Sequence, residues 1–193
     1  MELLPLVFTS GWASGINAYA VVVLLGLLGR FAGVDGVPAA LERTDVLVAA
    51  FVLYAVEFVA DKVPFVDSIW DAVHTAVRPT AGAVLGLLLT GDATSLDQAA
   101  AAATGGGAAL ASHAVKASLR LAVNTSPEPA SNVVTSVAED VTVAGVVTLA
   151  VFHPVAAAVV AAVLLLLGVV LAFALVRRIR RFRHAWRARS ATG

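Results

Sequence analysis

Six long apolar segments divide the sequence and constrain its fold more than any other feature. They fall near residues 8–31, 45–62, 67–90, 98–123, 131–152 and 154–176. A helix that crosses a bilayer needs about 20 consecutive, mostly apolar residues, and only helices or closed barrels satisfy their backbone groups in lipid. The segments therefore predict an all-α fold, a polytopic transmembrane helical bundle of about six spans.

The composition also points to lipid as the main solvent. Hydrophobic residues make up 60% of the chain and charged residues 13%, whereas soluble domains have about 25% charged residues. The chain has no cysteine, which excludes disulfides and thiolate metal sites. The segment near 45–62 is barely long enough to span, and those near 67–90 and 98–123 contain charges and glycines. One of these three segments could therefore be a broken or re-entrant helix rather than a full span.

Basic residues gather at the C-terminus, where seven arginines lie within the last 17 residues. We divide the chain into a transmembrane helical domain, 1–176, and a basic cytoplasmic tail, 177–193. Cytoplasmic loops retain positive charge, so six spans would place both termini in the cytoplasm. The tail is expected to bind anionic lipids of the bilayer rather than nucleic acid. Heavy use of Ala, Val and Arg indicates a bacterial protein, hence a multi-pass protein of the cytoplasmic (inner) membrane.

Two predicted hairpins contain most of the other charges. Four ionisable residues at spacings of 4, 3 and 4 share one helix face: Asp67, Asp71, His74 and Arg78. Before them come Glu57 and Asp61, four apart, then Lys62 and a turn at Pro64. The second hairpin has a turn at Pro127 and a comparable set of polar residues with the sign changed: Lys116, Arg120, Asn132, Ser136 and Glu139. This similarity predicts two related hairpins, an internal repeat, although chance similarity also explains it.

Depth places the charges in one layer. At about 1.5 Å per residue, Arg78 lies about 16 Å beyond Asp67, near the midplane of a hydrocarbon core about 30 Å thick. Lys116, Glu139 and Asp140 reach about 10–14 Å by the same count. A charge at the bilayer centre costs at least about 2.5–3.5 kcal/mol, so these side chains must face one another or water. Either they are buried ion pairs that lock the bundle, or they line a pathway.

Other features sharpen the pathway hypothesis. His74 and His113 lie at a depth similar to that of the carboxylates and are candidate proton carriers. Pro79 would weaken the helix next to Arg78 at membrane depth. Small residues around Asn17 indicate close helix packing or, alternatively, an unwound segment in which Asn17 and Ser112 face a substrate. No tight metal-ligand spacing or nucleophile elbow occurs, so no metal, cofactor or catalytic residue is predicted.

Several motifs resemble those of a known bacterial membrane-protein family, domain of unknown function 4126. They are SGxNAY in the first segment, EFVADKVPxxDSxWDxxHTxxRPxAG across the next two, and ASHxxKAxxRxxxNxSPEPxSN followed by SxxED. The resemblance extends to about residue 144. It implies the family's membrane fold and motif residues. It implies no substrate, because the family has no assigned activity.

The leading hypothesis is a small transporter or lipid-phosphate translocator with a charged intramembrane cavity. Arg78, Lys116 and Arg120 would hold an anionic group, while Asp71, His74 and Glu139 would exchange protons. The candidate pathway residues are Asn17, Glu57, Asp61, Lys62, Asp67, Asp71, His74, Arg78, His113, Lys116, Arg120, Asn132, Ser136, Glu139 and Asp140. Two alternatives are a non-catalytic membrane scaffold whose charges are structural ion pairs and a membrane enzyme that acts on lipid headgroups. A homodimer is expected because one protomer is small for alternating access.

Overall fold

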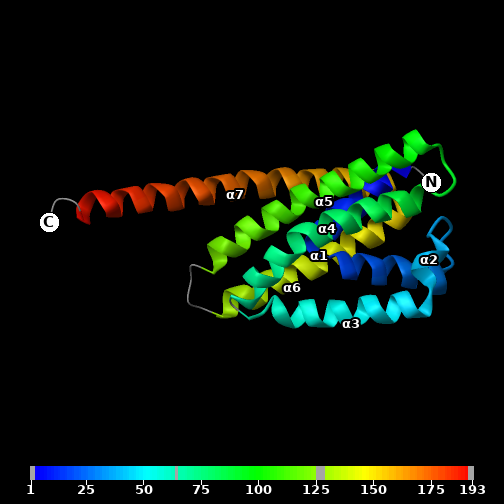
Figure 1. Ribbon diagram of the computed structural model, residues 1–193, viewed down its shortest axis with the longest axis horizontal. Coiled ribbons are helices and arrows are strands. Elements are labelled where there is room, and N and C mark those ends of the chain that lie inside the picture. The colour runs from blue at the N-terminus through cyan, green and yellow to red at the C-terminus, as the bar shows by residue number, and fades with distance from the viewer. Residues whose placement is uncertain (1–2, 64, 125–128, 191–193) are drawn as a thin grey trace.

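Helices make up the regular structure of the computed structural model, which describes residues 3–63, 65–124 and 129–190 (Figure 1). They are α1 (Leu3–Ala32), α2 (Ala39–Glu42), α3 (Thr44–Ala60), α4 (Val66–Thr90), α5 (Ser95–Val123), α6 (Pro129–Phe152) and α7 (Pro154–Ser190). Within these ranges no residue is in a strand, as predicted. The predicted turns at Pro64 and Pro127 lie outside the described residues.

Four helices are long and apolar enough to cross a membrane. They are α1, α4, α6 from Ala130 and α7 to Arg178, with mean hydropathies of 1.7, 1.3, 1.6 and 3.2. The 17-residue α3 and the more polar α5 are not among them. The prediction of a helical protein with membrane-spanning segments is therefore supported, but the count of six spans is not.

Helix α1 bends back on itself at Asn17, whose backbone is extended (φ −151°, ψ 96°). Leu6, early in the helix, packs with Ala150 and Leu89, which lie near the ends of α6 and α4. In the second half, Gly26 lies against Leu41, and Gly29 lies against Val37, in the segment between α1 and α3 at the same end. Both arms of α1 therefore point to one end of the bundle, and Asn17 forms the tip of a re-entrant hairpin (Figure 1).

The remaining long helices run between the two ends of the bundle. α3, α5 and α7 run in one direction and α4 and α6 in the other (Figure 1). We call the two ends the Thr90 end, where α4 passes to α5, and the Asn124 end, where α5 finishes. Because α1 returns to the Thr90 end, the start of α1 and the end of α7 lie at opposite ends (Figure 1). This arrangement differs from the predicted one, in which both termini share a side.

Small residues allow α1, α4 and α5 to approach closely. A Cβ atom at Gly105 would meet the carbonyl oxygen of Gly82, and one at Gly11 would meet that of Gly105. Helices in lipid associate largely through such tight packing. The backbones of α4 and α5 lie close together along much of their length, whereas those of α5 and α6 come close at few places. The predicted repeat of two hairpins is not confirmed.

The expected break at Pro79 does not occur, because α4 continues through it. Pro79 lies in α4, which packs closely against α5. The break in a buried helix occurs in α1, at Asn17. A break at membrane depth is tolerated where protein groups satisfy the freed backbone. The residues that do so at Asn17 form the candidate site.

Candidate functional site

A cluster of charged side chains fills the space between α3, α4, α5 and α6 next to the tip of α1. We call it the charged network, and its members are Glu57, Asp61, Asp67, Asp71, Arg78, Lys116, Arg120 and Glu139. All but Glu139 are buried, and its side chain is 16% exposed. The residues therefore form one connected cluster, and their common depth in a bilayer stays a prediction.

Arg78 joins α4 to α3 and α5. Its guanidinium donates to Glu57 of α3 at 2.8 Å and to Asp71, seven residues earlier on the same face of α4, at 2.9 Å. It also lies 2.8 Å from Nδ1 of His113. Arginine has no acceptor, so that nitrogen accepts, and Nε2 of His113 carries the hydrogen that Thr75 accepts at 3.1 Å. His113 is thus held as a neutral ring beside the cation.

Lys116 and Arg120 form the second half of the network. Lys116 Nζ lies 2.8 Å from Asp61, 3.5 Å from Glu139 and 3.6 Å from Glu57. Arg120 donates to Glu139 at 2.6 Å and to the side chain and backbone carbonyl of Asp61 at 3.2 and 2.7 Å. Because these residues are four apart on α5, both cations face the same carboxylates.

His74 lies at the edge of the network in a separate arrangement. Its Nδ1 donates to the carbonyl of Trp70 at 2.8 Å, because that carbonyl can only accept. Nε2 is then free to accept from the hydroxyl of Tyr19 at 3.0 Å. The imidazole also stacks on the Trp70 ring, with centroids 4.5 Å apart. Of the two histidines predicted as proton carriers, only His113 touches a network cation.

The tip of α1 supplies backbone groups to the same place. The first arm ends there, and its carbonyls at Gly15 and Ile16 accept from Arg78 at 3.5 Å and from Lys116 at 3.0 Å. A helix C-terminus carries partial negative charge and favours cations. Ser112 likewise donates to the carbonyl of Trp12 at 2.7 Å. The two network cations therefore satisfy a helix end that would otherwise be buried without partners.

Asn17 starts the second arm. Its side-chain oxygen accepts from the backbone N–H of Ala20 at 2.9 Å, as an N-cap residue does. Its amide nitrogen donates to Asp140 at 3.2 Å. An aspartate next to a helix N-terminus is favourable because that end is partly positive. The backbone at Asn17 is non-helical, and close helix packing is present beside it at Gly11 and Gly15. That Asn17 and Ser112 face a substrate stays a prediction.

The other predicted residues surround this centre. Lys62 lies apart from the network cations and donates to the carbonyl of Phe58 and to Ser136, at 2.9 and 3.2 Å. Asn132 donates to Asn124 at 2.9 Å. Asn124 in turn donates to Asp67, with its amide nitrogen 2.8 and 3.0 Å from the two carboxylate oxygens.

Sequence reasoning missed Tyr19, Thr75 and Asn124. Asn124 follows Arg120 by one helical turn, so the spacing of four that identified Lys116 and Arg120 would have found it. Tyr19 sits two residues after Asn17, and only the bend brings it to His74. Thr75 follows His74 directly and gave no periodic signal.

The charged network contains more acid than base. Five carboxylates (Glu57, Asp61, Asp67, Asp71 and Glu139) face three cations (Arg78, Lys116 and Arg120), so full ionisation would leave two negative charges in excess. Among the described residues, one buried carboxylate oxygen in each of Glu57, Asp61, Asp71 and Asp140 has no hydrogen-bond partner. Uncompensated buried charge is costly, so the network favours an additional proton or cation. No group of His, Asp and Glu in the described parts of the chain is arranged to hold a metal ion.

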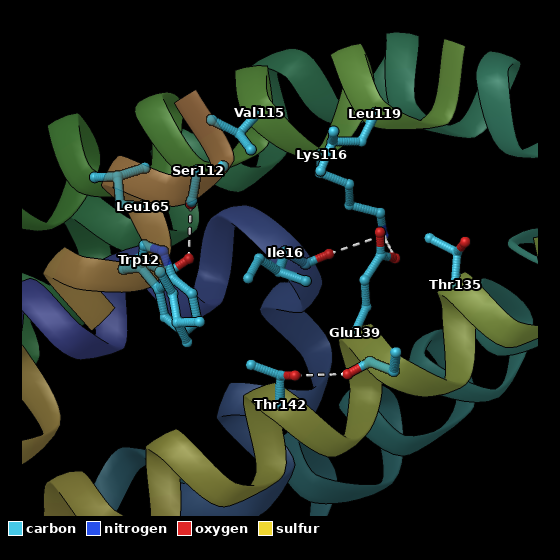
Figure 2. A pocket seen from close by; sticks show the side chains of 13 residues that line it. Trp12, Ile16, Ser112, Val115, Lys116, Leu119, Thr135, Glu139, Thr142 and Leu165 are labelled. Atoms are coloured by element: carbon cyan, nitrogen blue, oxygen red, sulfur yellow. Dashed lines mark hydrogen bonds and ion pairs between the residues drawn. The ribbon is translucent and has the colours of Figure 1, made fainter. Parts of the chain in front are cut away.

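A cavity of about 240 Å³ adjoins the network (Figure 2). It lies between α1, α5, α6 and α7, and most of its wall is apolar. Lys116 and Glu139 line its charged side, whereas Trp12, Ser112 and Leu165 lie on the opposite part in Figure 2. The Lys116–Glu139 ion pair is therefore the part of the charged network that borders this cavity.

Comparison with known proteins places the chain in one family. The family model described as "Domain of unknown function (DUF4126)" matches residues 4–174. Neither curated proteins nor solved structures give a match to the chain.

Proposed function

The chain belongs to the DUF4126 family, and from that starting point we propose that it is a small membrane transporter. One observation carries the proposal: the tip of a re-entrant helix meets a buried layer of charge. The freed carbonyls of Gly15 and Ile16 touch Arg78 and Lys116. Broken helices whose ends contact ions or substrate are a recurring feature of transporters, and ionisable residues inside a membrane usually serve a pathway.

The proposal includes a location and an orientation. The protein would lie in a bacterial inner membrane with its Asn124 end toward the cytoplasm, because Lys62 and the Arg-rich end of α7 lie at that end. The tail would bind anionic lipid headgroups. The start of α1 would then lie on the opposite side. A homodimer remains part of the proposal, with the exposed apolar face of α7 available for helix packing.

The geometry sets a condition on how an anion such as a lipid phosphate could bind. Arg78, Lys116 and Arg120 are each already paired with carboxylates. An anionic group could take their place only if a carboxylate moved away or gained a proton. Glu139 is the best candidate, because it is the most exposed member and lies against both Lys116 and Arg120. Proton exchange at Glu139 would then be coupled to substrate binding.

Cysteine accessibility tests the proposal without knowledge of the substrate. The chain has no cysteine, and Ser112→Cys and Ser136→Cys are nearly isosteric changes at buried positions around the site. A transporter exposes such positions to water, so we expect a membrane-impermeant thiol reagent to label them from each side in turn. Exposed positions near each end, Ser95→Cys and Phe65→Cys, serve as positive controls. Protection of both buried positions with both controls labelled would contradict transport.

A second candidate is a non-catalytic scaffold, and the number of ion pairs that each network cation makes favours it. Arg78 contacts two carboxylates and Lys116 contacts three. In a scaffold, buried ion pairs between helices would fix the register of those helices. The scaffold predicts protection of Ser112→Cys and Ser136→Cys from both sides, so the same experiment separates the two candidates.

A further inference from the structure

The cavity beside Glu139 has the shape of a site for an amphipathic molecule. Its walls include Ile16 of α1, Val115 and Leu119 of α5, and Leu164 and Leu165 of α7. Only one side carries charge, at Lys116 and Glu139. A molecule with an apolar body and one charged group would match this division, since ligand pockets combine apolar walls with a few polar groups that set orientation.

The charges that face Glu139 decide the sign of that group. α5 presents Arg120 and Lys116, α3 presents Asp61, and α6 itself adds Asp140 as the next residue. α1 presents the carbonyl of Ile16 through Lys116. The cavity wall from α7 carries no charged side chain. Each cation next to Glu139 is therefore already shared with another carboxylate.

Charge balance favours a cation. The network as a whole has five carboxylates against three cations. The carboxylate oxygens without a hydrogen-bond partner belong to Glu57, Asp61 and Asp71, whereas both oxygens of Glu139 accept from Arg120. Glu139 is the most exposed of the five carboxylates, and it lines the cavity. Trp12 adds an indole to the cavity wall, and an aromatic face attracts cations. An anion would instead add to an existing excess of negative charge.

We propose that this cavity binds a lipophilic cation, an organic ammonium or phosphonium with apolar substituents. This rests on the proposed transport function and names its substrate class. The cation would lie beside Glu139 with its apolar groups against α5 and α7, and one proton would leave the network for each cation bound. Charge stays constant in that exchange. The apolar exposed faces of α6 and α7 would let the cation enter from the lipid.

A pair of ions of nearly equal shape and opposite charge tests the inference. Purified full-length protein in detergent is dialysed against tetraphenylphosphonium or against tetraphenylborate, and saturable binding is measured from pH 6 to 8. We expect the phosphonium to bind, with affinity that rises with pH and with release of protons in weak buffer. Glu139→Gln should weaken binding at least about tenfold, because a buried charge partner is lost. Asp92→Asn, an exposed change in the α4–α5 connection, should leave it unchanged.

A second variant keeps the test valid if Glu139→Gln fails to fold. Thr142→Leu would fill part of the cavity from α6 without altering charge, and it should also weaken phosphonium binding. Saturable binding of the borate but not the phosphonium would overturn the inference in favour of an anionic amphiphile such as a lipid phosphate. Equal phosphonium binding by the wild type and both variants would show that the phosphonium does not bind in this cavity. If the phosphonium binds but cysteines at positions 112 and 136 stay protected from the thiol reagent, the binding site would be supported and transport contradicted.

Discussion

The ammonium nitrogen of Lys116 lies 3.0 Å from the carbonyl oxygen of Ile16, a residue 100 positions earlier in the chain. The same nitrogen lies within 3.6 Å of three carboxylates, on Glu57, Asp61 and Glu139. Lys116 therefore joins two features that are each costly alone, a buried helix end and a surplus of acid. Its ammonium group occupies a position suited to a cation, between three carboxylates and a carbonyl at the non-helical tip of α1.

Removal of that ammonium should destabilise the protein strongly. Lys116→Met keeps the length of the side chain but leaves three carboxylates and the Ile16 carbonyl without their shared partner. We expect a loss of about 3–5 kcal/mol, as for other broken buried pairs, seen as a lower Tm in detergent. Lys62→Met is the matched control, because the chain's other lysine lies outside the network and contacts a carbonyl, a hydroxyl and the Phe58 ring rather than a network carboxylate. Equal shifts in the two variants would show that Lys116 has no special role.

A partial rescue should follow if Asp61 is neutralised as well. Lys116→Met with Asp61→Asn removes the closest carboxylate charge along with the ammonium. The double variant should lose less stability than the sum of the two single variants, because contacting residues are coupled. Simple additivity in Tm would argue against a direct pair.

Arg78→Lys should be poorly tolerated although the charge is kept. The guanidinium reaches Glu57, Asp71 and His113 at once, from two of its nitrogens. An ammonium cannot match that fork geometry, so a loss of at least about 2 kcal/mol is expected for the bonds left unmade in a buried site. Arg43→Lys, at an exposed ion pair with Asp45, should change the Tm little. The comparison is contradicted if both variants keep the wild-type Tm.

Two glycines in the same run should respond oppositely to alanine. At Gly105 a Cβ atom would meet the backbone carbonyl of Gly82, so Gly105→Ala forces α4 and α5 apart and should cost about 1–3 kcal/mol. At Gly107 nothing lies within 4 Å of the added atom, and alanine favours the helix by up to about 1 kcal/mol. Gly107→Ala should therefore raise the Tm slightly. Thermal unfolding of both variants in one detergent checks the pair.

The tip of α1 can be probed through its cap. Asn17→Ala removes the acceptor for Ala20 N–H and the donor to Asp140, with an expected cost of about 0.5–2 kcal/mol. Asn17→Asp keeps the cap but places a second carboxylate beside Asp140. It should be worse at high pH and recover when Asp140→Asn is added. Failure of Asp140→Asn to restore the Tm of Asn17→Asp would mean that the two residues are not neighbours.

The charged layer could be predicted because its residues recur at helical spacings within apolar sequence. Asp71 and Arg78, or Lys116 and Arg120, share a face in any α-helix that contains them, and lipid leaves them no other place but the interior. Their pairing across helices follows from the excess of acid on α3 and α4 and of base on α5.

The re-entrant path of α1 could not be predicted in the same way. The 30-residue helix α1 has a mean hydropathy of 1.7, as high as that of a true span, so hydropathy alone indicates a single crossing. The bend depends on Asn17, which gains a partner in Asp140 123 residues later. Pro79 has the stronger local tendency to break a helix, yet α4 stays helical there. Long-range partners, rather than local propensity, decide where the backbone opens.

The bend in α1 also sets an order of events during biosynthesis. Its tip leaves the ribosome before its partners Ser112 and Lys116, which come 100 residues later. At about 5–20 residues per second, the ribosome adds those residues roughly 5–20 s after the tip. Until then the insertion machinery must shelter an apolar segment with an open end, or let it cross the bilayer as an ordinary span and turn back afterwards.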